Sequence, residues 1–405
     1  MTSAVDTVAP NRRALGRRAL VRRALGRLSP PGSLTVVGGL IGALIALWPG
    51  SLPRDVVTAA VLTGVCVAVM TAVGRALGSA RPERLITSWA VAALAVAVLM
   101  AGSIANTLWQ NILRSDIGIA GVGPAYPAAT AAAGCAGFVA VAWFGRRAAM
   151  AATAALATVV LFSTPATSAA ASIDATPTAA DIDRTATVLT DTWVREGGLR
   201  RGAVVIAVPT GSGWVDPQAT TAMRARLHDD VEFLSLPYAS ASSWRVFVSD
   251  RGSAATATVA LLRHVLDARD SLPPGVARPR VYLYGQSLGA LGADRAREWA
   301  NTRHPGAVAG TVLAGVPADT VDPRGGGSSR IVFANSSDPV TRWSTAAVWR
   351  PPTRPAQTRI VGARMHTPPW LPVVSFVQTS VDLLGALDGP AGTGHRYGPE
   401  QGALP

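Results

Sequence analysis

One serine in the C-terminal half of the chain lies in a pattern that suits a catalytic nucleophile. Ser287 is the central residue of Gly285-Gln286-Ser287-Leu288-Gly289, which follows a short apolar run and precedes an alanine-rich segment with helical spacing. A serine on a sharp strand-to-helix turn has a strained backbone, and such a turn forms where its close neighbours lack side chains, as the two glycines do. The amide of Leu288 would then lie at a helix N-terminus, where it can stabilise an oxyanion. The competing interpretation is a tight turn with an inert serine, and the strand-turn-helix context favours the nucleophile.

A histidine is needed to remove the proton of such a serine, and a carboxylate to orient the histidine. In this setting the order along the chain is serine, acid, histidine, and three histidines follow Ser287. We favour His395, which lies in a glycine-flanked loop after the last long helix. His366, in a loop before that helix, is the alternative. His304, at the end of the helix after the serine, is expected on the surface.

The acid of this group is predicted to be Asp338. It follows an expected strand at 331–333 and an Asn-Ser-Ser turn, so it lies at a strand end, where such a carboxylate belongs. Asp319 and Asp322 are loop alternatives, and Asp382 is expected to be helical.

A second glycine-containing loop follows an earlier expected strand and begins Thr210-Gly211. Its backbone can approach a ligand closely, so we interpret it as the second oxyanion donor, with a plain turn as the alternative. Phosphate binding is disfavoured because no lysine follows the loop. Cys66 and Cys135 lie within apolar segments, so they suggest no disulfide or metal framework. We expect no metal and no cofactor.

The elements that must position these residues alternate between strand and helix. Apolar runs, breakers and helical periodicity predict this order from residue 203 onwards, which indicates a mainly parallel sheet covered on both faces. The expected strands are 203–208, 231–236, 281–284, 310–313 and 331–333, and the expected helices are 254–268, 288–300 and 372–386.

The first 165 residues have the composition of a membrane domain. The chain of 405 residues is 49% hydrophobic and 15% charged, which is too apolar for one soluble globule. About 20 apolar residues are needed to cross a bilayer. Five windows reach or approach this length, and none contains Asp, Glu, Lys, Arg or His: 34–48, 56–73, 85–104, 126–144 and 148–165, the last being the weakest. A transporter usually needs such groups, so four to five spans are interpreted as an anchor.

Arginine placement predicts the orientation of these spans. The net charge is +13, all 37 basic residues are arginine, and the basic runs flank the apolar windows, which favours a membrane over nucleic acid. An N-terminal arginine-rich arm and the arginines after the second and fourth windows are consistent with the cytoplasmic side. If the fifth window spans the membrane, the C-terminal domain lies outside the cytoplasm, and we favour this arrangement. The predicted divisions are a basic arm at 1–32, a multi-span domain at 33–165, a linker at 166–181 and a catalytic domain at 182–405.

Several motifs together resemble the actinobacterial membrane-anchored α/β-hydrolase family, which joins a multi-span N-terminal domain to a catalytic domain. They are Thr210-Gly211-Ser212-Gly213-Trp214-Val215-Asp216-Pro217, Tyr238 with Ser243-Trp244, the segment 278–290 around Ser287, Asp338-Pro339-Val340 with Trp343, and Gly394-His395-Arg396-Tyr397. The resemblance covers nearly the whole chain and implies an α/β-hydrolase-like domain with Ser287 as nucleophile and Asp338 and His395 as partners. Gln286, where an acid is expected, and Pro237, where a polar residue is expected, depart from the pattern.

The sequence thus predicts a membrane-anchored serine hydrolase that cleaves carboxylic esters, of a lipid or cell-envelope molecule, through an acyl-enzyme. The expected partners are the lipid bilayer and a small-molecule or lipid ester, and the oligomeric state is not predicted. Acyl transfer to an acceptor other than water uses the same residues. A non-catalytic membrane scaffold is the alternative from another class.

Overall fold

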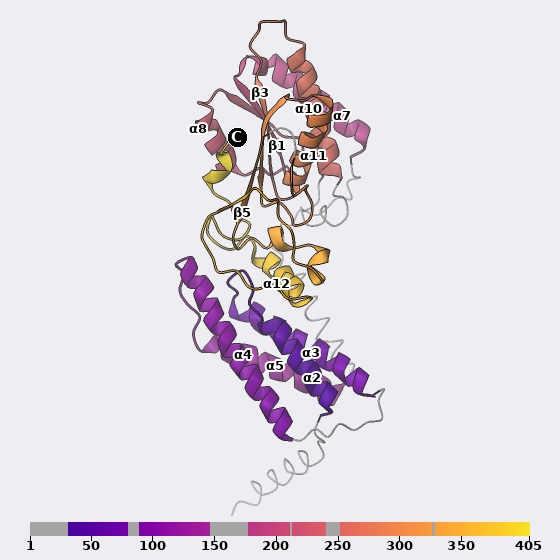
Figure 1. Ribbon diagram of the computed structural model, residues 1–405, viewed down its shortest axis with the longest axis vertical. Coiled ribbons are helices and arrows are strands. Elements are labelled where there is room, and N and C mark those ends of the chain that lie inside the picture. The colour runs from indigo at the N-terminus through magenta and orange to yellow at the C-terminus, as the bar shows by residue number, and fades with distance from the viewer. Residues whose placement is uncertain (1–30, 80–88, 146–176, 211–212, 240–251, 326–328) are drawn as a thin grey trace, which may run out of the picture.

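The computed structural model consists of a helical part and an α/β domain, arranged one above the other along its longest axis (Figure 1). It describes residues 31–79, 89–145, 177–210, 213–239, 252–325 and 329–405. The helix α12 (Val374–Asp382) lies where the two parts meet. The expected basic arm and the fifth apolar window lie outside the described residues.

Four apolar helices make up the helical part: α2 (Ser33–Leu47), α3 (Val56–Ser79), α4 (Trp89–Asp116) and α5 (Ala125–Phe144). Three are long and apolar enough to cross a membrane, over Val56–Ser79, Ala90–Asp116 and Ala125–Trp143. The number of such helices is lower than the four to five expected, because α2 has 15 residues and is shorter than the hydrocarbon layer requires. A side chain at Gly42 of α2 would overlap the backbone of α3, so the two helices pack at very close range.

The α/β domain contains a parallel sheet, as predicted, but with six strands where five were expected. Its order is β2-β1-β3-β4-β5-β6. The strands are β1 (Ala203–Val208), β2 (Val231–Leu234), β3 (Arg280–Gln286), β4 (Val308–Ala314), β5 (Arg330–Asn335) and β6 (Thr358–Val361). The register pairs Gln286, the last residue of β3, with Ala314, the last residue of β4. The carboxyl ends of β3 and β4 therefore lie side by side.

Helices cover both faces of this sheet (Figure 1). α7 (Ala179–Arg195), α10 (Ser253–Asp270) and α11 (Leu288–Arg303) cover one face, and α8 (Pro217–Arg226) packs with the C-terminal turn Pro399–Gly402 on the other. The apolar strands thus lie between two cores. The expected helix at 372–386 is a shorter α12 followed by the turn Leu383–Gly385.

A buried polar cluster joins the α/β domain to the helical part. Arg54, in the connection between α2 and α3, contacts Asp382 of α12 at 2.6 Å, and both side chains are at most 5% exposed. The hydroxyl and amide of Ser51 donate to the same carboxylate at 2.8 and 2.7 Å. Arg54 also donates to Gln378 of α12 at 2.5 Å. These contacts between distant parts of the chain, here called the seam, set how the α/β domain sits on the helices.

Candidate active site

The turn between β3 and α11 holds Ser287 in an unusual backbone conformation. Its φ is 55° and its ψ is −123°, a combination that costs a residue with a side chain about 1–3 kcal/mol. A Cβ at Gly285 would overlap the backbone of Gly289, and one at Gly289 would overlap the carbonyl of Val208. The two glycines therefore let the turn close, and Ser287 sits between the sheet edge and the helix.

His395 and Asp338 form a buried pair, although 57 positions separate them. The His395 Nδ1 lies 2.9 Å from Asp338 Oδ2, and the carboxylate side chain is fully buried. The Val340 amide donates to the other carboxylate oxygen at 2.8 Å. Asp338 follows β5, and its buried carboxylate accepts hydrogen bonds from several donors, as a buried polar group requires.

Tyr397 completes this pair from the C-terminal side. Its hydroxyl donates to Asp338 Oδ2 at 2.6 Å and accepts the Asn335 amide at 3.2 Å. Burial and the neighbouring carboxylate raise the pKa of the Tyr397 phenol well above its usual value of 10, so it remains a donor. Tyr397 belongs to the same glycine-rich motif as His395, but no sequence pattern indicated this contact.

The imidazole of His395 lies over the carboxyl end of β4, beside the serine turn. A Cβ built at Gly315, the residue after β4, would come within 2.5 Å of His395 Cε1. The amide of Ser287 donates to the carbonyl oxygen of Ala314, the residue before Gly315, at 2.9 Å. Adjacent strands lie about 4.8 Å apart, so the imidazole and the serine meet at one edge of the sheet.

The atoms that a nucleophile and its base would use form no hydrogen bond in the described part of the chain. His395 Nε2 is buried and has no hydrogen-bond partner there, and the Ser287 hydroxyl forms no hydrogen bond within the same ranges. Catalytic hydrogen bonds are often long before substrate binds. Gln286 is buried next to the serine, and its side-chain amide donates to the His395 carbonyl at 3.1 Å. Gln286, which departs from the family pattern, therefore helps to hold the loop that carries His395.

One of the predicted oxyanion donors is already occupied. The amide of Thr210 donates to the Trp214 carbonyl at 3.0 Å because the loop folds back on itself, so this amide does not point to a ligand. Gly211 lies outside the described residues. The amide of Leu288 is at the first position of α11, where no helical acceptor exists for it, which leaves it open to a ligand.

The alternative histidines lie elsewhere. His366 contacts Asp116 at the end of α4, with its Nδ1 2.9 Å from a carboxylate oxygen. His304 follows α11 and packs against Trp299 with 5.1 Å between ring centroids. Neither belongs to the group around Ser287.

The alternative acids are also engaged elsewhere. Asp319 accepts hydrogen bonds from Ser344, Thr353 and Arg350, and Asp382 belongs to the seam. Asp322 accepts the amide of Arg324. No group of three or more His, Cys, Asp or Glu side chains in the described ranges is arranged to hold a metal ion.

Comparisons with known proteins agree with this architecture. A family model described as the alpha/beta-hydrolase family matches residues 175–325 and 321–403. No curated protein and no solved structure matches the chain. The matched residues make up more than half of the chain and include the whole sheet together with Ser287, Asp338 and His395. The chain therefore belongs to the alpha/beta-hydrolase family.

Proposed function

We propose that the protein is a serine hydrolase that cleaves carboxylic esters through an acyl-enzyme. The observation that carries this proposal is the buried His395–Asp338 pair, whose free Nε2 lies beside a serine held at φ 55° on the turn between β3 and α11. A merely structural serine needs neither the strained turn nor a buried imidazole with an unused nitrogen.

In the first half of the reaction, Ser287 Oγ attacks the ester carbonyl carbon while His395 Nε2 takes the hydroxyl proton. Asp338 holds the imidazole through Nδ1 and stabilises its positive charge. The Leu288 amide donates to the oxyanion, with Gly211 as the second donor in place of Thr210. The tetrahedral intermediate then expels the alcohol, which receives the proton from His395.

In the second half, water attacks the carbonyl carbon of the acyl-enzyme, and His395 Nε2 takes a proton from this water. The bond between the acyl carbon and Ser287 Oγ breaks, and the proton passes from His395 to the serine oxygen. The products are a carboxylic acid and the free enzyme.

The substrates we propose are esters of lipids or of cell-envelope molecules. The seam joins the α/β domain directly to the connection between α2 and α3, so the active site stays near the bilayer. Esters at or near the membrane are therefore the molecules that it meets most often.

We propose further that the α/β domain lies outside the cytoplasm. Its contacts are to the α2–α3 connection and to Asp116 at the end of α4. Arg75 lies toward the opposite end of α3, and the sequence places the other arginine-rich segments beyond that same end. Basic residues collect on the cytoplasmic side, so the α/β domain is assigned to the other side.

Activity-based labelling tests the chemistry. We expect a fluorophosphonate probe to modify the full-length wild-type protein, and a Ser287→Ala variant to lose both labelling and hydrolysis of a short-chain p-nitrophenyl ester. A Ser271→Ala variant, altered at an exposed serine after α10, is the control and should keep both. Full esterase activity in Ser287→Ala would disprove the proposal.

Cysteine accessibility on intact cells tests the sidedness. In a chain with Cys66 and Cys135 replaced by alanine, Val276→Cys on the exposed surface of the α/β domain should react with a membrane-impermeant maleimide. Ser79→Cys, at the arginine-rich end of α3, is the control and should react only after permeabilisation. The reverse pattern would place the α/β domain in the cytoplasm.

A further inference from the structure

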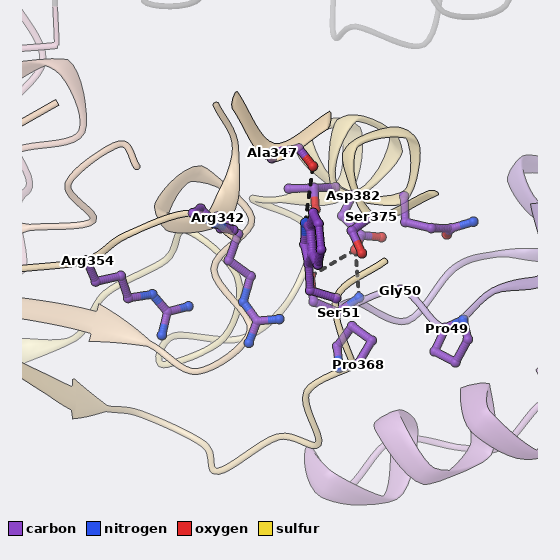
Figure 2. Close-up of a pocket in the computed structure, with 13 residues that line it drawn as sticks. Pro49, Gly50, Ser51, Arg342, Ala347, Arg354, Pro368, Ser375 and Asp382 are labelled. Atoms are coloured by element: carbon purple, nitrogen blue, oxygen red, sulfur yellow. Dashed lines mark hydrogen bonds between the residues drawn. The ribbon is translucent and has the colours of Figure 1, made fainter. Parts of the chain in front are cut away.

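A cavity of about 330 Å³ lies at the seam (Figure 2), and no residue of the serine turn lines it. Pro49, Gly50 and Ser51 of the α2–α3 connection form one side, and residues after β5 form the rest, including Pro368 and Trp370. Ligand sites of small molecules begin at about this volume and combine apolar walls with a few polar groups. This seam cavity has such a composition.

Two half-buried arginines line this cavity, and N–H donors of their guanidinium groups have no acceptor among the described residues. Arg342 uses one guanidinium nitrogen to donate to the Ser336 carbonyl at 2.8 Å, and its Nε is buried with no acceptor among the described residues. Arg354 forms no hydrogen bond or ion pair with any residue that the structure describes, although it lines the same cavity. Burial and the nearby charge of Arg354 lower the pKa of Arg342 to about 10. The two cations therefore destabilise each other.

The carboxylates near these arginines already have hydrogen-bond partners. The charge of Asp338 acts on both arginines, but its carboxylate bonds His395 and Tyr397. Asp382 is already paired with Arg54 and accepts two hydrogen bonds from Ser51. In Figure 2 the guanidinium groups of Arg342 and Arg354 lie to one side of the cavity, away from the Ser51–Asp382 contact. Partly burying a cation whose N–H donors lack acceptors costs free energy, which an anion in the cavity would offset.

We propose that the seam cavity binds an oxyanion group, a phosphate or a carboxylate, between Arg342 and Arg354. Guanidinium groups present planar sets of N–H donors that fit these anions and remain charged at physiological pH. The anion can be the head group of a lipid, because one wall belongs to the membrane part, or a free phosphate. The proposal does not depend on the esterase reaction, since no residue of the serine turn takes part.

Thermal unfolding of the purified full-length protein tests this proposal with two probes. Inorganic phosphate is compared with chloride at equal ionic strength, and nanodiscs of equimolar phosphatidylcholine and phosphatidylglycerol are compared with phosphatidylcholine alone. We expect at least one of the two probes to raise the melting temperature. Stabilisation by phosphate assigns a free anion, and stabilisation by phosphatidylglycerol alone assigns a lipid head group.

Variants show whether the effect comes from this cavity. Arg354→Gln and Arg342→Gln should each weaken binding of the effective probe by about tenfold or more, because each loses charge-assisted hydrogen bonds. Arg226→Gln, an exposed arginine at the end of α8, makes the same change in net charge and should bind as the wild type does. Ser287→Ala should also bind normally, which separates this test from that of the hydrolase.

Two results would overturn the proposal. One is that neither phosphate nor phosphatidylglycerol stabilises the wild-type protein. The other is that stabilisation persists undiminished in both arginine variants.

Discussion

The position of the His395 imidazole can be tested by adding one methyl group at Gly315. This residue follows β4 with φ +58°, and a Cβ there would lie 2.5 Å from His395 Cε1 and 2.9 Å from His395 Nδ1. Carbon atoms in contact are normally about 3.5–4.0 Å apart. A Gly315→Ala variant must therefore push the ring away by about 1 Å or more.

The expected effect has a catalytic and a structural component. A displacement of about 1 Å in a catalytic group can reduce the rate roughly 100-fold. The left-handed backbone conformation destabilises an alanine by about 1–2 kcal/mol whatever surrounds it. Gly275→Ala isolates the second component, because Gly275 has φ +85° and no other atom lies within 4 Å of the position of its Cβ.

The assay is the rate at which a fluorophosphonate modifies Ser287, measured together with the melting temperature. We expect Gly315→Ala to react about 100 times more slowly than the wild type, whereas Gly275→Ala should react at the wild-type rate. Both variants should lose some thermal stability. If Gly315→Ala reacts as fast as Gly275→Ala, the reactivity of Ser287 does not depend on the imidazole lying over β4. The assignment of His395 as the base is then refuted.

Three further predictions concern the groups around this site and the seam. Asp338→Asn should slow labelling by roughly 1,000-fold or more, because an amide no longer orients and stabilises the charged His395, and unchanged labelling would remove Asp338 from the mechanism. Above pH 10 the unfolded chain releases the Tyr397 proton that the folded chain keeps, so the stability of the wild-type protein falls with rising pH. The difference in melting temperature between Tyr397→Phe and the wild type should therefore become smaller above pH 10. A constant difference would contradict the raised pKa of Tyr397. Asp382→Ala leaves Arg54 buried without its partner, which costs about 3–5 kcal/mol. Amide hydrogen exchange in α12 should therefore accelerate at least about 100-fold. An unchanged exchange rate would show that the seam is open in solution.

The sheet was predictable from the sequence because its central strands are buried on both faces. The run 203–208 is uniformly apolar and ends at Pro209, and it proved to be the buried strand β1. The edge strand β6 was missed because it consists of four residues, Thr358–Val361, that are half exposed and follow no such pattern. The helix α8 was missed because it is polar, although Asp216 before Pro217 is a recognisable start signal.

The site was predictable where its residues lie at the ends of predicted elements. The place of Ser287 follows from two glycines and a strand-to-helix change, and that of Asp338 from the end of β5. The pairing of Asp338 with His395 could be proposed from chain order, but its distance required the fold. The seam had no sequence signal at all, because Arg54 and Asp382 are single residues more than 300 positions apart.

The seam also bears on which bonds the proposed hydrolase can reach. A catalytic domain on a loose tether samples many heights above a bilayer, whereas one fixed through Arg54 and Asp382 keeps its nucleophile at a constant height. For the proposed ester hydrolase, this constant height is expected to favour esters that protrude from the membrane surface by one matching distance. Lengthening the spacer between acyl chain and head group in a series of substrates should consequently give an optimum and not a steady trend.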